Sequence, residues 1–85
     1  MNPRPVKAIP HPDHSLTLTF DNGEVKRFDL APYLGYPAFE PLRNIGFFQL
    51  AHCQDGNLEW PGNLDFDPDR LYLESKPIAQ QAEAT

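Results

Sequence analysis

One stretch near the N-terminus decides the fold, and it reads Ser15-Leu16-Thr17-Leu18-Thr19-Phe20-Asp21-Asn22-Gly23. Large apolar residues alternate with serine and threonine before the turn, which is typical of a strand with one apolar face. The Asp-Asn-Gly sequence is a strong hairpin signal, and a second apolar segment follows over residues 25–30. The sequence therefore predicts a β-hairpin with strands over residues 15–20 and 25–30.

The length of the hairpin loop determines which side chains share the apolar face. A two-residue loop would turn Phe28 and Leu30 away from the leucine row. A three-residue loop, with Gly23 left-handed in a bulge, pairs Leu16 with Phe28 instead. Because a slip of one residue moves every side chain to the opposite face, burial favours the three-residue loop.

Short elements are expected elsewhere in the first half of the chain. Residues 7–10 suit a short strand that ends in a polar turn. Asp29 can cap a helical turn that begins at Ala31, because proline at the next position suits a helix start. Residues 36–40 read as a proline-interrupted connection. Residues 41–50 predict a short helix, whose last part Asn44 can cap.

The second half predicts another hairpin and another helix. Strands over residues 50–54 and 57–60 would meet at an Asp55-Gly56 turn, and Pro61-Gly62 makes a further turn. Asp67-Pro68-Asp69 resembles a helix N-terminus, with a cap, a proline and an acid in order. Residues 1–74 are expected to form a single small α+β domain. Residues 75–85 lose the aromatic residues and predict a flexible C-terminal tail.

Charge and cysteine content restrict the classes of function. The chain of 85 residues has twelve acids against seven bases and a net charge of −5, which disfavours direct nucleic-acid binding. The acids concentrate in residues 55–74, so an acidic face would repel anionic membranes and attract a basic partner. One cysteine fits a reducing compartment, and neither a signal peptide nor a membrane span is visible. We therefore expect a cytoplasmic protein.

Three carboxylates at alternate positions, Asp65, Asp67 and Asp69, suggest a calcium loop. In an EF-hand that starts at Asp65, Arg70 would occupy position six and Lys76 position twelve, where glycine and glutamate are needed. Helix capping and solvated charge explain these aspartates better. The sequence therefore predicts no metal and no cofactor at this point.

Histidine and cysteine residues provide the other candidates for chemistry. His11 and His14 have a spacing that zinc would accept, but no pair of cysteines completes the site. His52 and Cys53 are adjacent on a predicted strand, so their side chains point to opposite faces. No recognisable motif orients Cys53 as a nucleophile, and a buried structural thiol is the commoner role for a free cysteine.

The aromatic residues divide into core and surface candidates. Trp60 alternates with polar neighbours on a predicted strand and is expected in the core. Tyr33, Tyr36 and Phe39 suit an exposed patch that binds a partner, although packing at the edge of the core explains them too. Glu59 and Asp65 have no evident folding role, and we add them to the candidate partner-binding residues.

Three blocks in a fixed order make the chain similar to a known family. The blocks are Leu16-Thr17-Leu18-Thr19-Phe20-Asp21-Asn22-Gly23-Glu24, Phe28-Asp29-Leu30-Ala31-Pro32-Tyr33-Leu34, and Glu59-Trp60-Pro61-Gly62-Asn63-Leu64-Asp65 followed by Leu71-Tyr72. Over about residues 4–74 the chain resembles the small bacterial proteins grouped as domain-of-unknown-function family 2442. The family pattern usually has Trp-Pro-Asn-Gly-x-Asp, and here the turn residues are permuted.

The resemblance implies a small antiparallel sheet of β-hairpins with one or two short helices, and no established activity. Some relatives are similar to antitoxin-like partners of a small neighbouring protein. Others carry an added helix-turn-helix DNA-binding domain, for which nothing after Tyr72 is long or apolar enough here. The sequence thus leads us to expect a non-enzymatic protein-binding module, an antitoxin-like or regulatory partner of a small protein.

Two rival functions remain open. A small metal-dependent or small-molecule-binding enzyme would use His14, His52 and the carboxylates of Asp65, Asp67 and Asp69. Homo-oligomerisation would use an exposed strand edge of the hairpin sheet.

Overall fold

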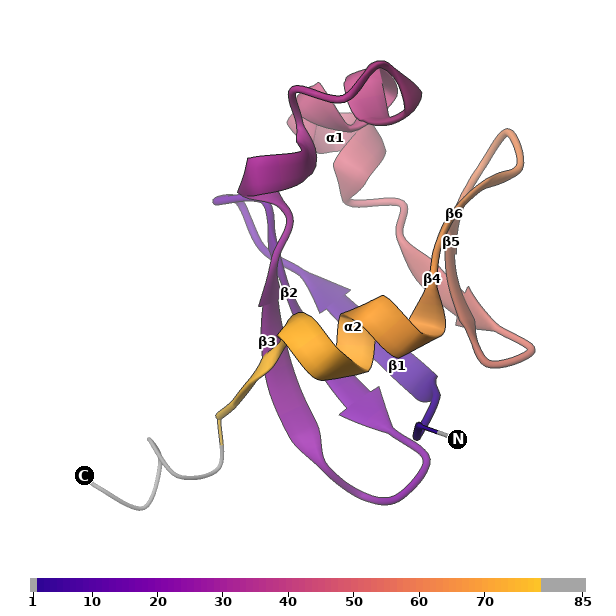
Figure 1. The fold of residues 1–85 in the computed structure, drawn as a ribbon. Helices are drawn as coiled ribbons and strands as arrows, with labels where there is room; N and C mark the ends of the chain where they lie inside the picture. Colours follow the sequence, from indigo (N-terminus) through magenta and orange to yellow (C-terminus); the bar gives the residue numbers. More distant parts are fainter. Residues whose placement is uncertain (1, 79–85) are drawn as a thin grey trace.

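Two small antiparallel sheets and four short helical segments make up the fold, in a computed structural model that describes residues 2–78 (Figure 1). One sheet has four strands in the order β1-β2-β3-β7, and the other has three in the order β4-β5-β6. The strands are β1 Pro5–Pro10, β2 Ser15–Phe20, β3 Val25–Asp29, β4 His52–Gln54, β5 Asn57–Trp60, β6 Leu64–Phe66 and β7 Lys76–Pro77. The helical segments are η1 Ala31–Tyr33, η2 Pro37–Arg43, α1 Ile45–Phe48 and α2 Pro68–Glu74. This arrangement confirms the predicted α+β class.

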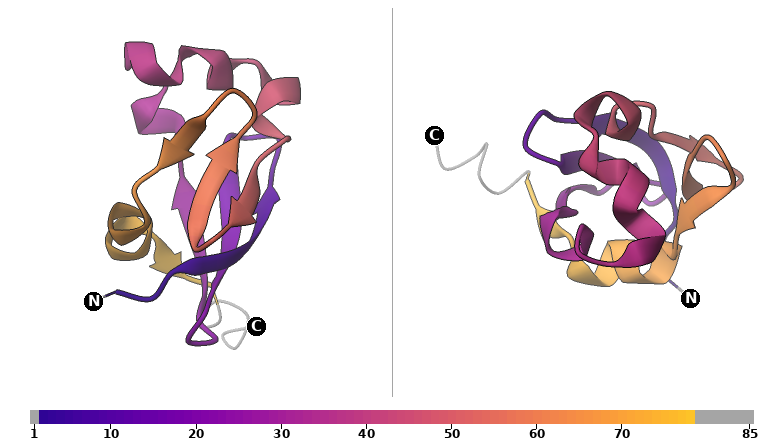
Figure 2. Two further views of the ribbon diagram at one scale, coloured as in Figure 1. Left: turned by 90° about the vertical axis from the view of Figure 1, so that its right-hand side faces the viewer. Right: turned by 90° about the horizontal axis from the view of Figure 1, so that it is seen from above.

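The core lies between the two sheets and the helices. In Figure 1, α2 crosses in front of the four-stranded sheet, and the three-stranded sheet stands beside it. The segments η1, η2 and α1 cover one end, as Figure 2 shows from above. Both sheets and three of the helices contribute buried side chains: Leu16, Leu18, Phe20, Phe28, Leu30, Leu42, Phe48, Leu58, Trp60, Phe66 and Leu71. Among the described residues, no helix is long and apolar enough to span a membrane.

The β2–β3 hairpin has the register that burial favours. Leu16 pairs with Phe28, as the three-residue loop requires. The amide of Phe20 donates to the carbonyl of Glu24 at 2.8 Å. Gly23 has a φ of +92°, the left-handed conformation that only glycine adopts without strain. The predicted loop and register are therefore confirmed.

The helical region differs from the prediction. Residues 36–40, expected as a connection, mostly belong to the 3₁₀ segment η2, which runs on through Pro41 to Arg43. Asn44 is extended, and only Ile45–Phe48 is α-helical, so the predicted helix over residues 41–50 was too long. Pro41 has no backbone N–H to donate and therefore disfavours a continuous α-helix. The Asn44 cap is confirmed, since its Oδ1 accepts from the Phe47 amide at 3.1 Å.

The second hairpin is confirmed, with a shorter first strand than predicted. β4 begins at His52, and the Asp55-Gly56 turn has positive φ at both residues (54° and 79°), as a type I′ turn requires. Asp67 caps α2 as predicted, because its Oδ1 accepts from the Asp69 amide at 3.1 Å.

Two strands were not predicted. β6 extends the second hairpin into a three-stranded sheet, after a turn in which Gly62 and Asn63 have positive φ. β7 pairs Lys76 with Arg27 and Pro77 with Lys26, so the four-stranded sheet continues past the domain boundary expected at residue 74. Residues 79–85 of the expected tail lie outside the described residues.

Candidate functional site

A cleft of about 260 Å³ lies where η1, η2, β6 and the start of α2 meet. Four residues that the sequence marked for partner binding line it together: Tyr33, Tyr36, Phe39 and Asp65. Phe66, Asp67 and Arg70 complete the lining. The fifth candidate, Glu59, lies outside the cleft but directly opposite Asp65 in the β5–β6 ladder. We call this surface the aromatic cleft.

The aromatic rings of the cleft run from the core to the surface. Phe66 is only 4% exposed, and its ring centroid lies 5.1 Å from that of Tyr33 and 5.4 Å from that of Phe39. Tyr36 packs edge-on against Tyr33 at 5.7 Å and is 55% exposed. Tyr33 and Phe39 are half-buried, so they serve both as core edge and as cleft wall. A lone exposed tyrosine on a fixed aromatic base is a suitable anchor for a partner.

A network from α2 holds Tyr33 in place. The Tyr33 hydroxyl donates to the carboxylate of Glu74, and Arg70 Nε lies 3.7 Å from the same carboxylate. Burial, followed by the bond to Glu74, raises the pKa of Tyr33, so its hydroxyl remains a donor at neutral pH. Glu74 forms an ion pair with Arg70 one turn away on α2. The carboxylate of Glu74 therefore neutralises the charge of the one basic side chain that lines the cleft.

The acidic side of the cleft is not neutralised within the fold. Asp65 and Glu59 face each other across β5 and β6. Like charges directly opposite in a sheet are destabilising. His52 Nε2 lies 3.8 Å from Glu59, and it counts as a partner only when protonated. In the part of the chain that is described, no ion pair involves Asp65. Folding therefore does not explain these two carboxylates.

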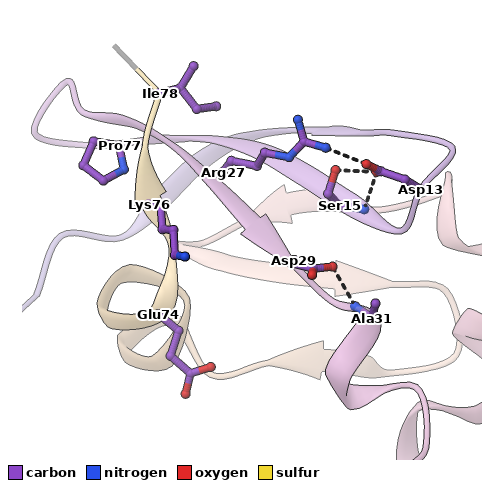
Figure 3. Close-up of a pocket in the computed structure, with 9 residues that line it drawn as sticks. All are labelled: Asp13, Ser15, Arg27, Asp29, Ala31, Glu74, Lys76, Pro77 and Ile78. Carbon is purple, nitrogen blue, oxygen red and sulfur yellow. Dashed lines mark hydrogen bonds and ion pairs between the residues drawn. The ribbon is translucent and has the colours of Figure 1, made fainter. Parts of the chain in front are cut away.

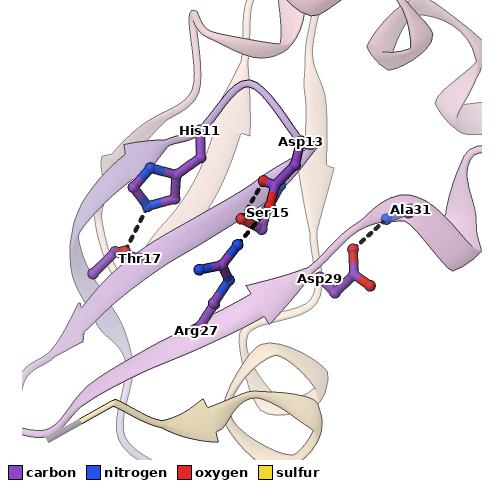
Figure 4. Close-up of polar contacts among 7 residues, drawn as sticks. All are labelled: His11, Asp13, Ser15, Thr17, Arg27, Asp29 and Ala31. Atoms are coloured by element: carbon purple, nitrogen blue, oxygen red, sulfur yellow. Dashed lines mark hydrogen bonds and ion pairs between the residues drawn. The ribbon is translucent and has the colours of Figure 1, made fainter. Parts of the chain in front are cut away.

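A second hollow, of about 400 Å³, lies on the outer face of the four-stranded sheet beside β7 (Figure 3). Its polar groups largely satisfy one another. Arg27 and the Ser15 hydroxyl each donate to Asp13 at 2.5 Å, and Asp29 accepts from the Ala31 amide at 3.1 Å (Figure 4). The Ser15 hydroxyl is the main cause that lowers the pKa of Asp13. Although this hollow is larger, it has no aromatic wall, and its rim ends at the last described residue, Ile78.

The residues named for a zinc site and those named for the rival enzyme do not converge. His11 Nε2 lies 2.6 Å from the Thr17 hydroxyl, and His14 Nε2 lies 2.9 Å from the Leu42 carbonyl (Figure 4 shows the first). His52 lies in the three-stranded sheet, where it pairs with Glu59 of β5. Over residues 2–78, no three His, Cys, Asp or Glu side chains come close enough to hold a metal ion.

Cys53 and Trp60 belong to the core and its edge. Trp60 is 2% exposed, and its indole Nε1 donates to the Phe48 carbonyl at 2.9 Å, which confirms its predicted place. Cys53 packs against the core, and burial raises its pKa to about 11. A thiol with that pKa is almost wholly protonated at neutral pH, which makes it a weak nucleophile.

Sequence reasoning missed Phe66, Asp67 and Arg70 as parts of the cleft. Asp67 was expected as a helix cap and as one carboxylate of the rival enzyme, and not as part of the partner-binding surface. β6 is too short for its alternation to be recognised. The sequence pattern therefore did not show that these three residues share the cleft with Asp65.

Comparison with known proteins identifies the family but no activity. No curated protein and no solved structure matches the chain. Residues 5–77, which include all seven strands, match the model of the family described as "Protein of unknown function (DUF2442)". The chain therefore belongs to this family, as its three sequence blocks indicate.

Proposed function

We propose that this protein is a non-enzymatic binding module that docks a protein partner in the aromatic cleft. The observation that carries the proposal is the meeting of Tyr33, Tyr36, Phe39 and Asp65 on one surface. The three aromatic residues lie close together in the sequence, and the fold brings Asp65 of β6 to them. Aromatic side chains are enriched at protein interfaces, where they supply large contact areas.

The charge of the cleft defines the partner. Asp65 and Glu59 place two carboxylates side by side at the cleft and its border. A basic surface on the partner would relieve their repulsion and speed its approach. We place this function in the cytoplasm, because the lone cysteine fits a reducing compartment. The partner is thus a cytoplasmic protein with a basic patch, and the antitoxin-like role of some relatives fits this description.

Co-purification from the native cell tests the proposal. The full chain, tagged and expressed at its native level, should retain a partner in stoichiometric amount. Tyr36→Ser removes the exposed anchor, and Asp65→Asn removes one charge without changing shape. Each variant should lower retention of that partner by about tenfold or more, as truncation of an interface anchor does.

Two matched controls separate the cleft from general surface effects. Leu73→Ser removes an apolar side chain that is 69% exposed and does not line the cleft. Asp55→Asn removes the same charge as Asp65→Asn at a turn where asparagine tolerates positive φ. Both controls should retain the partner. Recovery of the free chain alone, or equal retention by all four variants, would overturn the proposal. Light scattering on the purified chain identifies a second copy as the partner.

A further inference from the structure

The wall of the aromatic cleft formed by β6 is also the open edge of a sheet. β6 is the last strand in the order β4-β5-β6. Within residues 2–78, no turn, loop or side chain donates to or accepts from the backbone of Leu64, Asp65 or Phe66 on that side. In an antiparallel pair, successive residues direct both backbone groups alternately toward and away from the neighbour. β6 therefore presents at least one N–H and C=O pair without a partner.

The two faces of β6 carry different chemistry. Asp65 lies on the same face as Glu59, its partner across the ladder. Phe66 lies on the other face, pairs with the buried Leu58 and contacts the rings of Tyr33 and Phe39. A strand added beside β6 would place alternate side chains on these two faces. On one face, the side chains of the added strand would contact carboxylates. On the other face, they would contact aromatic rings.

Building on the proposed function, we infer that the partner docks as an extended segment along β6, in which a basic residue alternates with an apolar one. The basic side chain lies against Asp65 and Glu59. The apolar side chain lies against the rings of Tyr33, Tyr36 and Phe39. Strand addition gives affinity through the main chain and specificity through alternate side chains, which this edge provides.

The edge favours an extended partner over a helical one. A helix satisfies its own backbone groups, so it would leave those of β6 unpaired beneath it. Arginine suits the basic position better than lysine, because its planar guanidinium can pair with two carboxylate oxygens at once. On the aromatic face, the exposed ring of Tyr36 is the cleft residue most accessible to the apolar side chain of the segment.

A random dodecapeptide library displayed on phage tests this inference without knowledge of the partner. The immobilised full chain selects peptides, and the Tyr36→Ser variant removes those that bind elsewhere. The expected peptides contain arginine or lysine at alternate positions with aliphatic or aromatic residues between them. A synthetic copy of the most enriched peptide should bind Asp65→Asn at least tenfold more weakly and Asp55→Asn unchanged.

Amide hydrogen exchange measured by NMR provides the structural readout. Bound peptide should slow exchange of an amide in Leu64–Phe66, because a strand partner covers it. Enriched peptides with the helical pattern of apolar residues at i, i+3, i+4 and i+7 in place of alternation, peptides without basic residues, protection confined to other elements, or no enrichment that depends on Tyr36 would each overturn the inference.

The two proposals fail separately. If the native partner depends on Tyr36 and Asp65 while the selected peptides are helical or acidic, the cleft binds a protein and the extended segment is wrong. If the native partner ignores both substitutions, the proposed function itself is wrong, and the edge-strand inference falls with it.

Discussion

Lys26 donates from Nζ to the backbone carbonyl of Tyr72 at 2.9 Å, and the same nitrogen lies 3.8 Å from the centroid of the Tyr72 ring. The lysine sits on the core face of β3, opposite Leu18, and is only 8% exposed. Tyr72 in turn donates from its hydroxyl to Glu24 at 2.6 Å. A single cation thus joins the first hairpin to α2 at a point where most strands would carry an apolar side chain.

Lys26→Ala should destabilise the protein by about 1–3 kcal/mol, because it removes a hydrogen bond from a charged donor, a cation–π contact and a buried aliphatic stem. Urea denaturation followed by the fluorescence of Trp60 measures the change. Arg27→Ala is the matched control on the next residue of β3, where an exposed ion pair with Asp13 should contribute much less. Equal costs for the two variants would contradict the assigned role of Lys26.

Gly23→Ala should cost about 1–2 kcal/mol, because the residue has a φ of +92° and a side chain there strains the backbone even though the space around it is open. Gly35→Ala is the comparison. No atom lies within 4 Å of its added Cβ, and its φ is not in the positive range. This second change should be neutral or stabilise the protein slightly. Thermal melts of both variants measure the difference, and a stable Gly23→Ala protein would argue against the bulged loop.

Stability should fall as pH rises from 9 to 11, in part because of Cys53. Burial raises the pKa of this thiol from its ordinary value of 9.0 to about 11. The unfolded chain therefore loses the proton first, so the stabilisation is fully present below pH 9 and is lost as pH rises through 11. Cys53→Ser lacks this titration, so the difference in unfolding free energy between the two proteins should change across this interval. Parallel pH profiles would show that the thiol is not shifted.

Asp67→Ala should cost about 1 kcal/mol, because it leaves the Asp69 amide at the start of α2 without its cap. Asp67→Asn should preserve most of the stability, since asparagine caps equally well. Circular dichroism and urea titration compare the two. The asparagine variant is also useful for binding studies, because it removes a charge from the aromatic cleft while α2 remains capped.

The sequence predicted the elements that rest on strong local signals. The register of the first hairpin follows from the burial of Leu16 and Phe28, and the start of α2 from Asp67 and Pro68. Each of these choices is made by residues that are neighbours in the chain, so a pattern of a few positions contains the information.

The sequence did not predict the features that depend on distant contacts. β6 has three residues, too few for an alternating pattern, and it exists because Leu64 and Phe66 can pair with β5. A lysine on the core face of β3 needs a partner, and the Tyr72 carbonyl that accepts from it lies 46 positions away in the chain. The aromatic cleft was predicted in part. Apart from Phe66, its aromatic residues were named from the sequence, but the contact with Phe66 became evident only from the fold.

Phe66 gives the cleft a property that the exposed rings alone would not have. Its buried ring contacts those of both Tyr33 and Phe39, and the indole of Trp60 bonds the same small sheet to the carbonyl of Phe48. The walls of the cleft are therefore held by the core before any ligand arrives. A mobile surface loses conformational entropy when it binds a partner, and a preorganised surface loses less. Even a short peptide segment can therefore bind this cleft with useful affinity.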